Sequence, residues 1–292
     1  MKHSIQNNFF QITVKETGAE LCSIKSLLTN QEYLWQANSQ VWGSHAPNLF
    51  PIIGSLKNNG FIHQGKFYPM TKHGFIRNNQ DIRLLQKTTN ELRFVLNSNE
   101  KTRKLYPFEF EFQIHFILDN NTLKIKHEII NTGETELLFC LGGHPAFACP
   151  LHDEENYEDY YLEFEKEEKV NTWNLSSEGL IGEEGKLILD QSKVLNLHPE
   201  LFANDALIFK NLRSNNISLK SKKSNFQLKV SFHDFPYLGL WAKPNASYVC
   251  IEPWIGIADK VDSNQEFSTK EMIQHLPGGK EFTTSYSIEI NE

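Results

Sequence analysis

The stretch Phe108-Glu109-Phe110-Glu111-Phe112-Gln113-Ile114-His115-Phe116 decides the fold class of this chain. Apolar and polar residues alternate through it without a break, so one face of an extended strand is apolar and the other is polar. Similar alternation recurs, with turn-forming residues between the runs, at residues 92–96, 123–126, 226–232 and 286–290. No long segment has a helical period, and short helical turns are expected only near residues 200–202 and 269–272. These patterns predict an all-β protein built as a large antiparallel sandwich with few short helices.

The length and composition favour one large domain. The chain has 292 residues, of which 39% are hydrophobic and 21 are phenylalanine, enough to fill a sizeable core. No Pro-, Ser- or Gly-rich linker and no internal repeat divides the sequence. We therefore expect a single β-sandwich domain over residues 1–292.

Charge and targeting signals limit the classes of partner and the cellular location that we expect for the protein. The formal net charge of −7 argues against a general binder of nucleic-acid phosphates. The N-terminus has no apolar signal core, and no stretch approaches the roughly 20 apolar residues of a membrane helix. We expect a cytoplasmic protein without nucleic-acid or membrane partners, and either a monomer or a homodimer.

The cysteines and an acidic run have simple structural interpretations. Cys22, Cys140, Cys149 and Cys250 match no CxxC spacing, so we expect small buried apolar residues rather than a zinc or redox site. The acidic run at residues 153–168 is either a metal or partner site or, as we expect, a solvated loop that leads into a strand at residues 160–164.

Two histidines and one glutamate are the candidate acid–base groups. His73 is followed by Gly74 and His144 is preceded by Gly143, and such glycines allow other groups to approach closely. Glu252 follows an apolar run, and we expect it at the end of that strand. The alternative interpretation is that Glu252 is an ordinary surface glutamate without a functional role. Two imidazoles and a carboxylate can perform general acid–base chemistry at neutral pH, if the fold brings them together.

Cations and tryptophans accompany these groups. Lys57 and Arg77 are candidate binding residues for an anion or for hydroxyl groups. The alternative is that both are ordinary surface cations. Trp241 and Trp254 favour a sugar pocket or, alternatively, plain core packing. The phosphate loop GxxxxGK[ST], the dinucleotide loop GxGxxG and the nucleophile elbow GxSxG are all absent from the sequence.

Six short motifs in a fixed order resemble the aldose 1-epimerase (galactose mutarotase-like) family, and most closely its LacX-type bacterial branch, which is related to the glucose-6-phosphate 1-epimerases. They are NLFPIIG (48–54), HGFIR (73–77), GHPAF (143–147), NDALIF (204–209), LGLW (238–241) and CIEPW (250–254). The resemblance implies a β-supersandwich that interconverts the α and β anomers of an aldose without a cofactor or metal.

The resemblance also implies a role for each site residue. His144 would protonate the ring oxygen, Glu252 would take the proton from the anomeric hydroxyl, and His73 would hydrogen-bond the sugar nearby. The remaining residues would bind the sugar in the pocket, and these are Lys57, Arg77, Asp205 and Trp241.

The choice between a hexose and a hexose 6-phosphate stays open at this stage. The galactose mutarotase pattern has an Arg-Asn pair after the glycine near position 54, where this chain has Ser55 and Leu56. The sugar-phosphate branch usually has Arg at the position of Lys57 and Gln at the position of Lys72.

Two rival functions remain. His73, His144 and Glu252 could form a two-histidine, one-carboxylate metal site, although the close His-x-Asp/Glu pair typical of such sites is missing. A non-catalytic sugar-binding protein on the same fold is the second rival.

Overall fold

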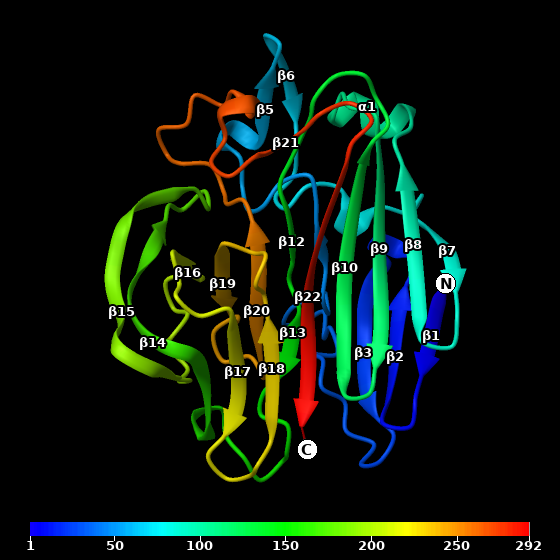
Figure 1. Cartoon of the computed structure of the whole chain (residues 1–292). Coiled ribbons are helices and arrows are strands. Elements are labelled where there is room, and N and C mark those ends of the chain that lie inside the picture. Colours follow the sequence, from blue (N-terminus) through cyan, green and yellow to red (C-terminus); the bar gives the residue numbers. More distant parts are fainter. Residues whose placement is uncertain (292) are drawn as a thin grey trace.

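The structure is a computed structural model, in which residues 1–291 are described, and it is built almost entirely of strands (Figure 1). Strands account for 51% of the residues and helices for 7%, and the paired strands of each sheet are antiparallel. The predicted all-β antiparallel sandwich is therefore confirmed.

A nine-stranded sheet forms the larger layer and contains the stretch that predicted the fold. Its order is β15-β14-β17-β18-β22-β10-β9-β8-β7. Its strands are β7 (Arg83–Lys87), β8 (Glu91–Asn97), β9 (Phe110–Asp119), β10 (Thr122–Asn131), β14 (Tyr160–Leu175), β15 (Ile181–Asn196), β17 (Asn216–Ser221), β18 (Gln227–Ser231) and β22 (Glu281–Asn291). In Figure 1 the long β14–β15 hairpin curves away from the rest of this sheet.

A six-stranded sheet carries the candidate site. Its order is β16-β19-β20-β12-β4, with β13 paired to β20 as well. Its strands are β4 (Asn48–Leu49), β12 (Leu141–Gly143), β13 (Ala146–Ala148), β16 (Leu207–Lys210), β19 (Tyr237–Trp241) and β20 (Tyr248–Ile255).

Smaller sheets and short helices complete the fold. The remaining strands are β1 (Lys2–Gln6), β2 (Phe10–Lys15), β3 (Glu20–Ser26), β5 (Gly60–His63), β6 (Lys66–Pro69), β11 (Leu137–Phe139) and β21 (Gln274–Leu276). The α-helix α1 (Glu100–Leu105) is joined by the 3-10 helices η1 (Thr17–Ala19), η2 (Lys57–Asn59), η3 (Ile76–Asn78), η4 (Tyr157–Asp159) and η5 (Phe267–Thr269).

The helical segments were predicted only in part. Helix α1 was not expected, although Asn99 caps it by accepting from the backbone N–H groups of Lys101 and Thr102. The turn expected near residue 269 corresponds to η5, whereas residues 200–202 lie in non-helical turns.

The alternating stretch buries its apolar face as predicted. Phe110, Phe112, Ile114 and Phe116 of β9 are at most 1% exposed. They belong to one continuous apolar cluster that extends from Ile5 to Ile290. This continuity agrees with a single domain over residues 1–292, which stays a prediction.

The four cysteines are all buried and unpaired, as expected. The acidic run does lead into a strand, β14, but the expectation of a solvated run is wrong for two of its members. Glu155 is buried and accepts hydrogen bonds from the hydroxyl groups of Tyr160 and Ser221. Glu168 is buried and accepts from the backbone and side chain of Ser214. These carboxylates anchor neighbouring segments.

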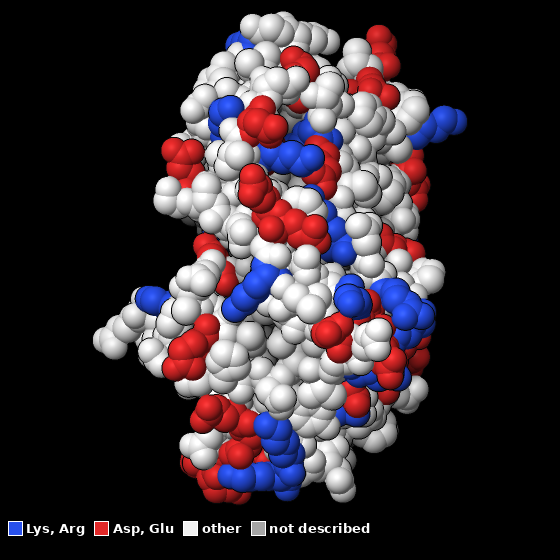
Figure 2. All heavy atoms as spheres, turned by 90° about the vertical axis from the view of Figure 1, so that its left-hand side faces the viewer, with Lys and Arg blue, Asp and Glu red and all other residues white. Residues whose placement is uncertain are grey.

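Two surface properties bear on partners. On the face shown in Figure 2, basic and acidic side chains are interspersed. Among residues 1–291, no helix combines the length and apolarity needed to span a bilayer.

His127 is a polar residue on the apolar face of β10, and we expect it to make the protein sensitive to acid. It is completely buried, and neither ring nitrogen has a hydrogen-bond partner within residues 1–291. Burial, and secondarily the nearby His115, lowers the pKa of His127 from 6.5 to about 3. The folded state binds a proton at His127 less readily than the unfolded state does. The contribution of neutral His127 to the free energy of unfolding is therefore complete above pH 6.5 and is lost as the pH falls toward 3.

Replacement of His127 by Leu should therefore flatten the acid side of the stability curve. Between pH 8 and pH 5, the free energy of unfolding of the wild type should fall by about 2 kcal/mol more than that of His127→Leu. Urea unfolding at both pH values measures this difference, with the exposed His152→Leu as the control. Equal pH dependence in wild type and His127→Leu would contradict the assignment.

Candidate active site

A cavity of about 920 Å³ opens between the six-stranded sheet and the end of the β14 strand. One wall carries His73, His144 and Glu252. The lining also includes Asn174 of β14 and Ser177 of the following turn. The fold thus brings together the three acid–base candidates, which are far apart in the sequence.

His144 is held directly after β12 by pairing on both sides of that strand. Gly142 pairs with Trp254 of β20, and Gly143 pairs with Asn48 of β4. A Cβ atom on Gly143 would lie 2.5 Å from the hydroxyl oxygen of Tyr286, so this position has no room for a larger residue. The resulting close packing fixes the backbone from which the imidazole projects into the cavity.

Glu252 lies within β20 and not at its end, so the sequence-based placement of this residue is wrong. The entire strand is buried, and Glu252 is 1% exposed. Its Oε2 atom lies 3.2 Å from Nε2 of His144. The contact lacks hydrogen-bond geometry, because Oε2 has no hydrogen-bond partner among the described residues. The carboxylate therefore remains available to a ligand.

Burial disfavours the charged forms of both members of this pair. It raises the pKa of Glu252 well above its usual range and lowers the pKa of His144 to about 3. Burial thus favours a neutral imidazole beside a protonated carboxyl group. A pair in this state can release one proton and accept another at short range.

His73 is oriented by two hydrogen bonds to Gly54. The backbone N–H of His73 donates to the carbonyl of Gly54 at 2.8 Å, and the backbone N–H of Gly54 donates to Nδ1 of His73 at 3.1 Å. Because Nδ1 accepts, the neutral ring carries its proton on Nε2. Burial lowers the pKa of His73 well below its usual value, which favours this neutral form. His73 can therefore donate a hydrogen bond but is a poor source of a full proton.

Aromatic rings surround His144. Trp42 stacks on its imidazole at 5.1 Å between ring centroids, and Trp241 approaches edge-on at 5.9 Å. Both tryptophans and Trp254 line the cavity. Sequence reasoning selected Trp241 and missed Trp42, whose only signal was its position two residues before Ser44 in a glycine-containing loop.

The predicted binding residues fall into two groups. Arg77 and Asp205 line the cavity, and the guanidinium of Arg77 donates to the hydroxyl of Ser44 at 3.3 Å. Lys57 does not line it, because its ammonium group donates to the carbonyl of Ser263 and its backbone to Asp259. The expectation that Lys57 lines the pocket is therefore wrong.

Lys72 is the cavity cation that sequence reasoning did not select. It lines the cavity, is exposed, and has no hydrogen bond or ion pair with the described protein residues. Its position next to His73 was visible in the sequence, but only the fold reveals that its side chain faces the same cavity.

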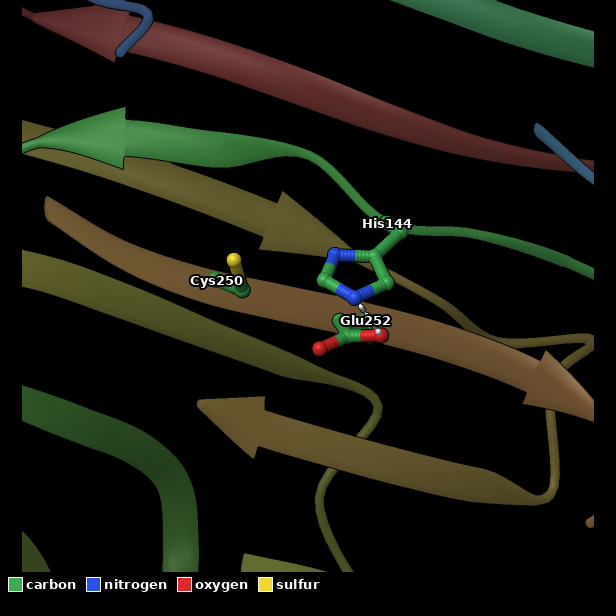
Figure 3. Close-up of side chains that lie close together, drawn as sticks. All are labelled: His144, Cys250 and Glu252. Carbon is green, nitrogen blue, oxygen red and sulfur yellow. Dashed lines mark ion pairs between the residues drawn. The ribbon is translucent and has the colours of Figure 1, made fainter. Parts of the chain in front are cut away.

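A potential metal-ligand group overlaps the acid–base pair. His144, Cys250 and Glu252 place one ligand atom each within 4.8 Å of one another (Figure 3). His73, which the metal-enzyme rival required, is not a member of this group. The structure thus replaces the expected second histidine with a cysteine.

Comparison with solved structures defines this as a protein with the galactose mutarotase-like fold. A galactose mutarotase related enzyme from Lactobacillus acidophilus is 37% identical, with a TM-score of 0.94 over 100% of this chain and 98% of that chain. A galactose mutarotase-like protein from Lactobacillus casei is 26% identical, with a TM-score of 0.92 over 100% of both chains.

The chain belongs to the aldose 1-epimerase family. The family model described as aldose 1-epimerase matches residues 1–275, which include every candidate site residue. Protein LacX of Lactococcus lactis, known in plasmid and chromosomal forms, is 32% identical over 99% of both chains. The resemblance inferred from six motifs is confirmed, and it supports a role as a sugar epimerase.

Proposed function

We propose that this chain is a mutarotase that interconverts the α and β anomers of a hexose or hexose phosphate by general acid–base catalysis. The observation that carries this proposal is the 3.2 Å approach of His144 and Glu252 at the wall of a cavity. The two oxygens of an anomeric carbon are close neighbours, so two groups at this spacing can serve both. The family assignment supports the same chemistry.

Ring opening needs one proton to leave the anomeric hydroxyl and one to reach the ring oxygen. In the proposed direction the carboxyl proton of Glu252 first passes to Nε2 of His144 across their 3.2 Å contact, which gives a carboxylate beside an imidazolium. Glu252 then accepts the proton of the anomeric hydroxyl, and His144 supplies its proton to the ring oxygen. The C1–O5 bond breaks, the aldehyde turns about C1–C2, and the reversed transfers close the ring on the other face. The proton count of the pair is conserved, and the reverse step uses the same groups in opposite roles. His73 donates a hydrogen bond through Nε2 to a sugar oxygen.

Polarimetry tests the proposed function directly. Freshly dissolved α-glucose and α-galactose, and their 6-phosphates, should reach anomeric equilibrium faster with the protein than in the same buffer alone. The rival, a sugar-binding protein without turnover, would bind one of these sugars in calorimetry but leave the rate unchanged.

We expect full activity after exhaustive treatment with EDTA. Proton transfer between a sugar and two side chains requires no metal or cofactor, as the family resemblance also implies. The assay is polarimetry before and after dialysis against the chelator. Loss of activity that one added metal restores would favour the metal-enzyme rival.

Arg77 and Lys72 are proposed to distinguish a phosphorylated from a neutral sugar. Both line the cavity, and Lys72 has no partner among the described residues. If the substrate is phosphorylated, Arg77→Ala should weaken the sugar phosphate at least about tenfold, the minimum loss of a charge-assisted contact, and the free sugar far less. Calorimetry with paired sugars measures the difference.

Lys57→Ala is the matched control, because Lys57 lies outside the cavity. The Lys57→Ala protein should bind both sugars as tightly as the wild type does. An equal loss of both sugars in Arg77→Ala would assign the guanidinium to hydroxyl groups. It would also remove the argument for a phosphate.

A further inference from the structure

Three metal-ligating side chains converge beside the cavity (Figure 3). We propose that His144, Cys250 and Glu252 form a binding site for a thiophilic divalent ion such as Zn²⁺, and that the bound ion inhibits the epimerase. The binding site rests on the geometry alone, and only the inhibition rests on the proposed function.

The strand β20 supplies two of the ligands. Cys250 and Glu252 are two residues apart, so their side chains lie on the same face of the strand. His144 reaches that face from the segment after β12, and Figure 3 shows its ring directed toward the carboxylate of Glu252, with Cys250 on the same strand. Thiolate, imidazole and carboxylate are the three side-chain donors that Zn²⁺ uses in proteins.

The spacing fits one ion. Zn–N and Zn–O bonds of roughly 2.0–2.2 Å at tetrahedral angles place two ligand atoms about 3.3 Å apart. Nε2 of His144 and Oε2 of Glu252 are already 3.2 Å apart. The sulfur of Cys250 completes a group whose ligand atoms all lie within 4.8 Å of one another, and coordination of one ion would draw these atoms closer together.

Unused bonding capacity also favours an ion. Oε2 of Glu252 is buried and has no hydrogen-bond partner among residues 1–291. A buried carboxylate without such partners is costly in free energy, and a divalent cation offsets that cost. Entry is from the cavity, since His144 and Glu252 line it whereas Cys250 does not.

Binding changes protons but not oxidation states. The ion displaces the thiol proton of Cys250, and any proton on Glu252, into solvent and forms bonds to sulfur, nitrogen and oxygen. A fourth position faces the cavity and takes a water molecule. Once Nε2 and the carboxylate are coordinated, neither can exchange a proton with the sugar, so mutarotation stops.

Binding is tested on metal-free full-length protein with ZnCl₂ in calorimetry and with CoCl₂ in absorption spectroscopy. We expect one ion per chain and an ultraviolet charge-transfer band from thiolate to Co²⁺. Cys250→Ser should lose that band and bind Zn²⁺ at least about tenfold more weakly. Cys149→Ser, which replaces another buried free cysteine outside the cavity, should behave as the wild type. Cys250→Ala serves the same purpose if the serine variant does not fold.

The absence of the thiolate band, or equal Zn²⁺ affinity in wild type and both Cys250 variants, overturns the site. In the activity arm, Zn²⁺ should abolish mutarotation in the wild type and EDTA should restore it. Cys250→Ser should keep its basal rate and lose most of the sensitivity to Zn²⁺. A rate that rises with Zn²⁺ overturns the inhibitory role. If no sugar is turned over, the proposed function fails while the binding arm still decides the site.

Discussion

His144→Ala and Glu252→Gln should each lower the rate of mutarotation at least ~10²-fold, the lower range for loss of a general acid or base. The side chains lie 3.2 Å apart on the cavity wall, and each has a separate proton to move in the proposed reaction. The measurement is polarimetry with the best sugar found for the wild type, after subtraction of the spontaneous rate.

The double variant should be little slower than either single variant, because residues that act as a unit are not additive. His152→Ala and Glu154→Gln are matched controls at exposed positions and should retain the wild-type rate. Circular dichroism must show that all variants are folded. A near wild-type rate in either single variant would remove that residue from its proposed role.

Gly74→Ala should destabilise the protein by about 2–5 kcal/mol and abolish activity. Gly74 has a φ of +75°, where an L-residue costs roughly 1–2 kcal/mol. A Cβ atom there would also lie 2.2 Å from the carbonyl oxygen of Phe50, and such overpacking typically costs a further 1–3 kcal/mol or more. Relief of the clash would move the adjacent His73 out of the cavity wall. Urea unfolding measures the loss.

Gly65→Ala is the matched control. Its φ of +74° is nearly the same, but no atom of the described part of the chain lies within 4 Å of the added Cβ atom. It should lose only the conformational cost, roughly 1–2 kcal/mol. If the free energy of unfolding fell equally in both alanine variants, the contact with Phe50 would not contribute, and the explanation for Gly74 would be wrong.

Local sequence determined the strands of this protein. The alternation in residues 108–116 predicted β9, because a period of two places every second side chain on one face and the phenylalanines of that face are buried. The runs at residues 92–96, 123–126, 226–232 and 286–290 likewise lie in or overlap β8, β10, β18 and β22. Helix α1 was missed because six residues are too few for a helical period to be visible.

The sequence also nominated His73, His144 and Glu252, through glycine contexts and motif order. It could not establish that they share a cavity, because the distance between residues 144 and 252 depends on the pairing of β12 and β13 with β20. Glu252 was misplaced at a strand end for a related reason. A carboxylate is not expected inside a fully buried strand, so the sequence suggested that the strand ends before Glu252. Only the structure reveals the imidazole of His144 beside it.

Only the tertiary structure sorted the remaining residues. Lys57 and Lys72 are the same residue type, but the ammonium group of Lys57 donates to the carbonyl of Ser263. Lys72 lines the cavity and has no partner among the residues that the structure describes. Trp42 joins the site by stacking on a histidine about a hundred positions away. Cys250 joins only the potential metal-ligand group, because it shares a strand face with Glu252. Side-chain periodicity is a local property that a sequence carries directly, whereas contacts between distant segments are fixed by sheet pairing and close packing, which no short stretch of sequence contains.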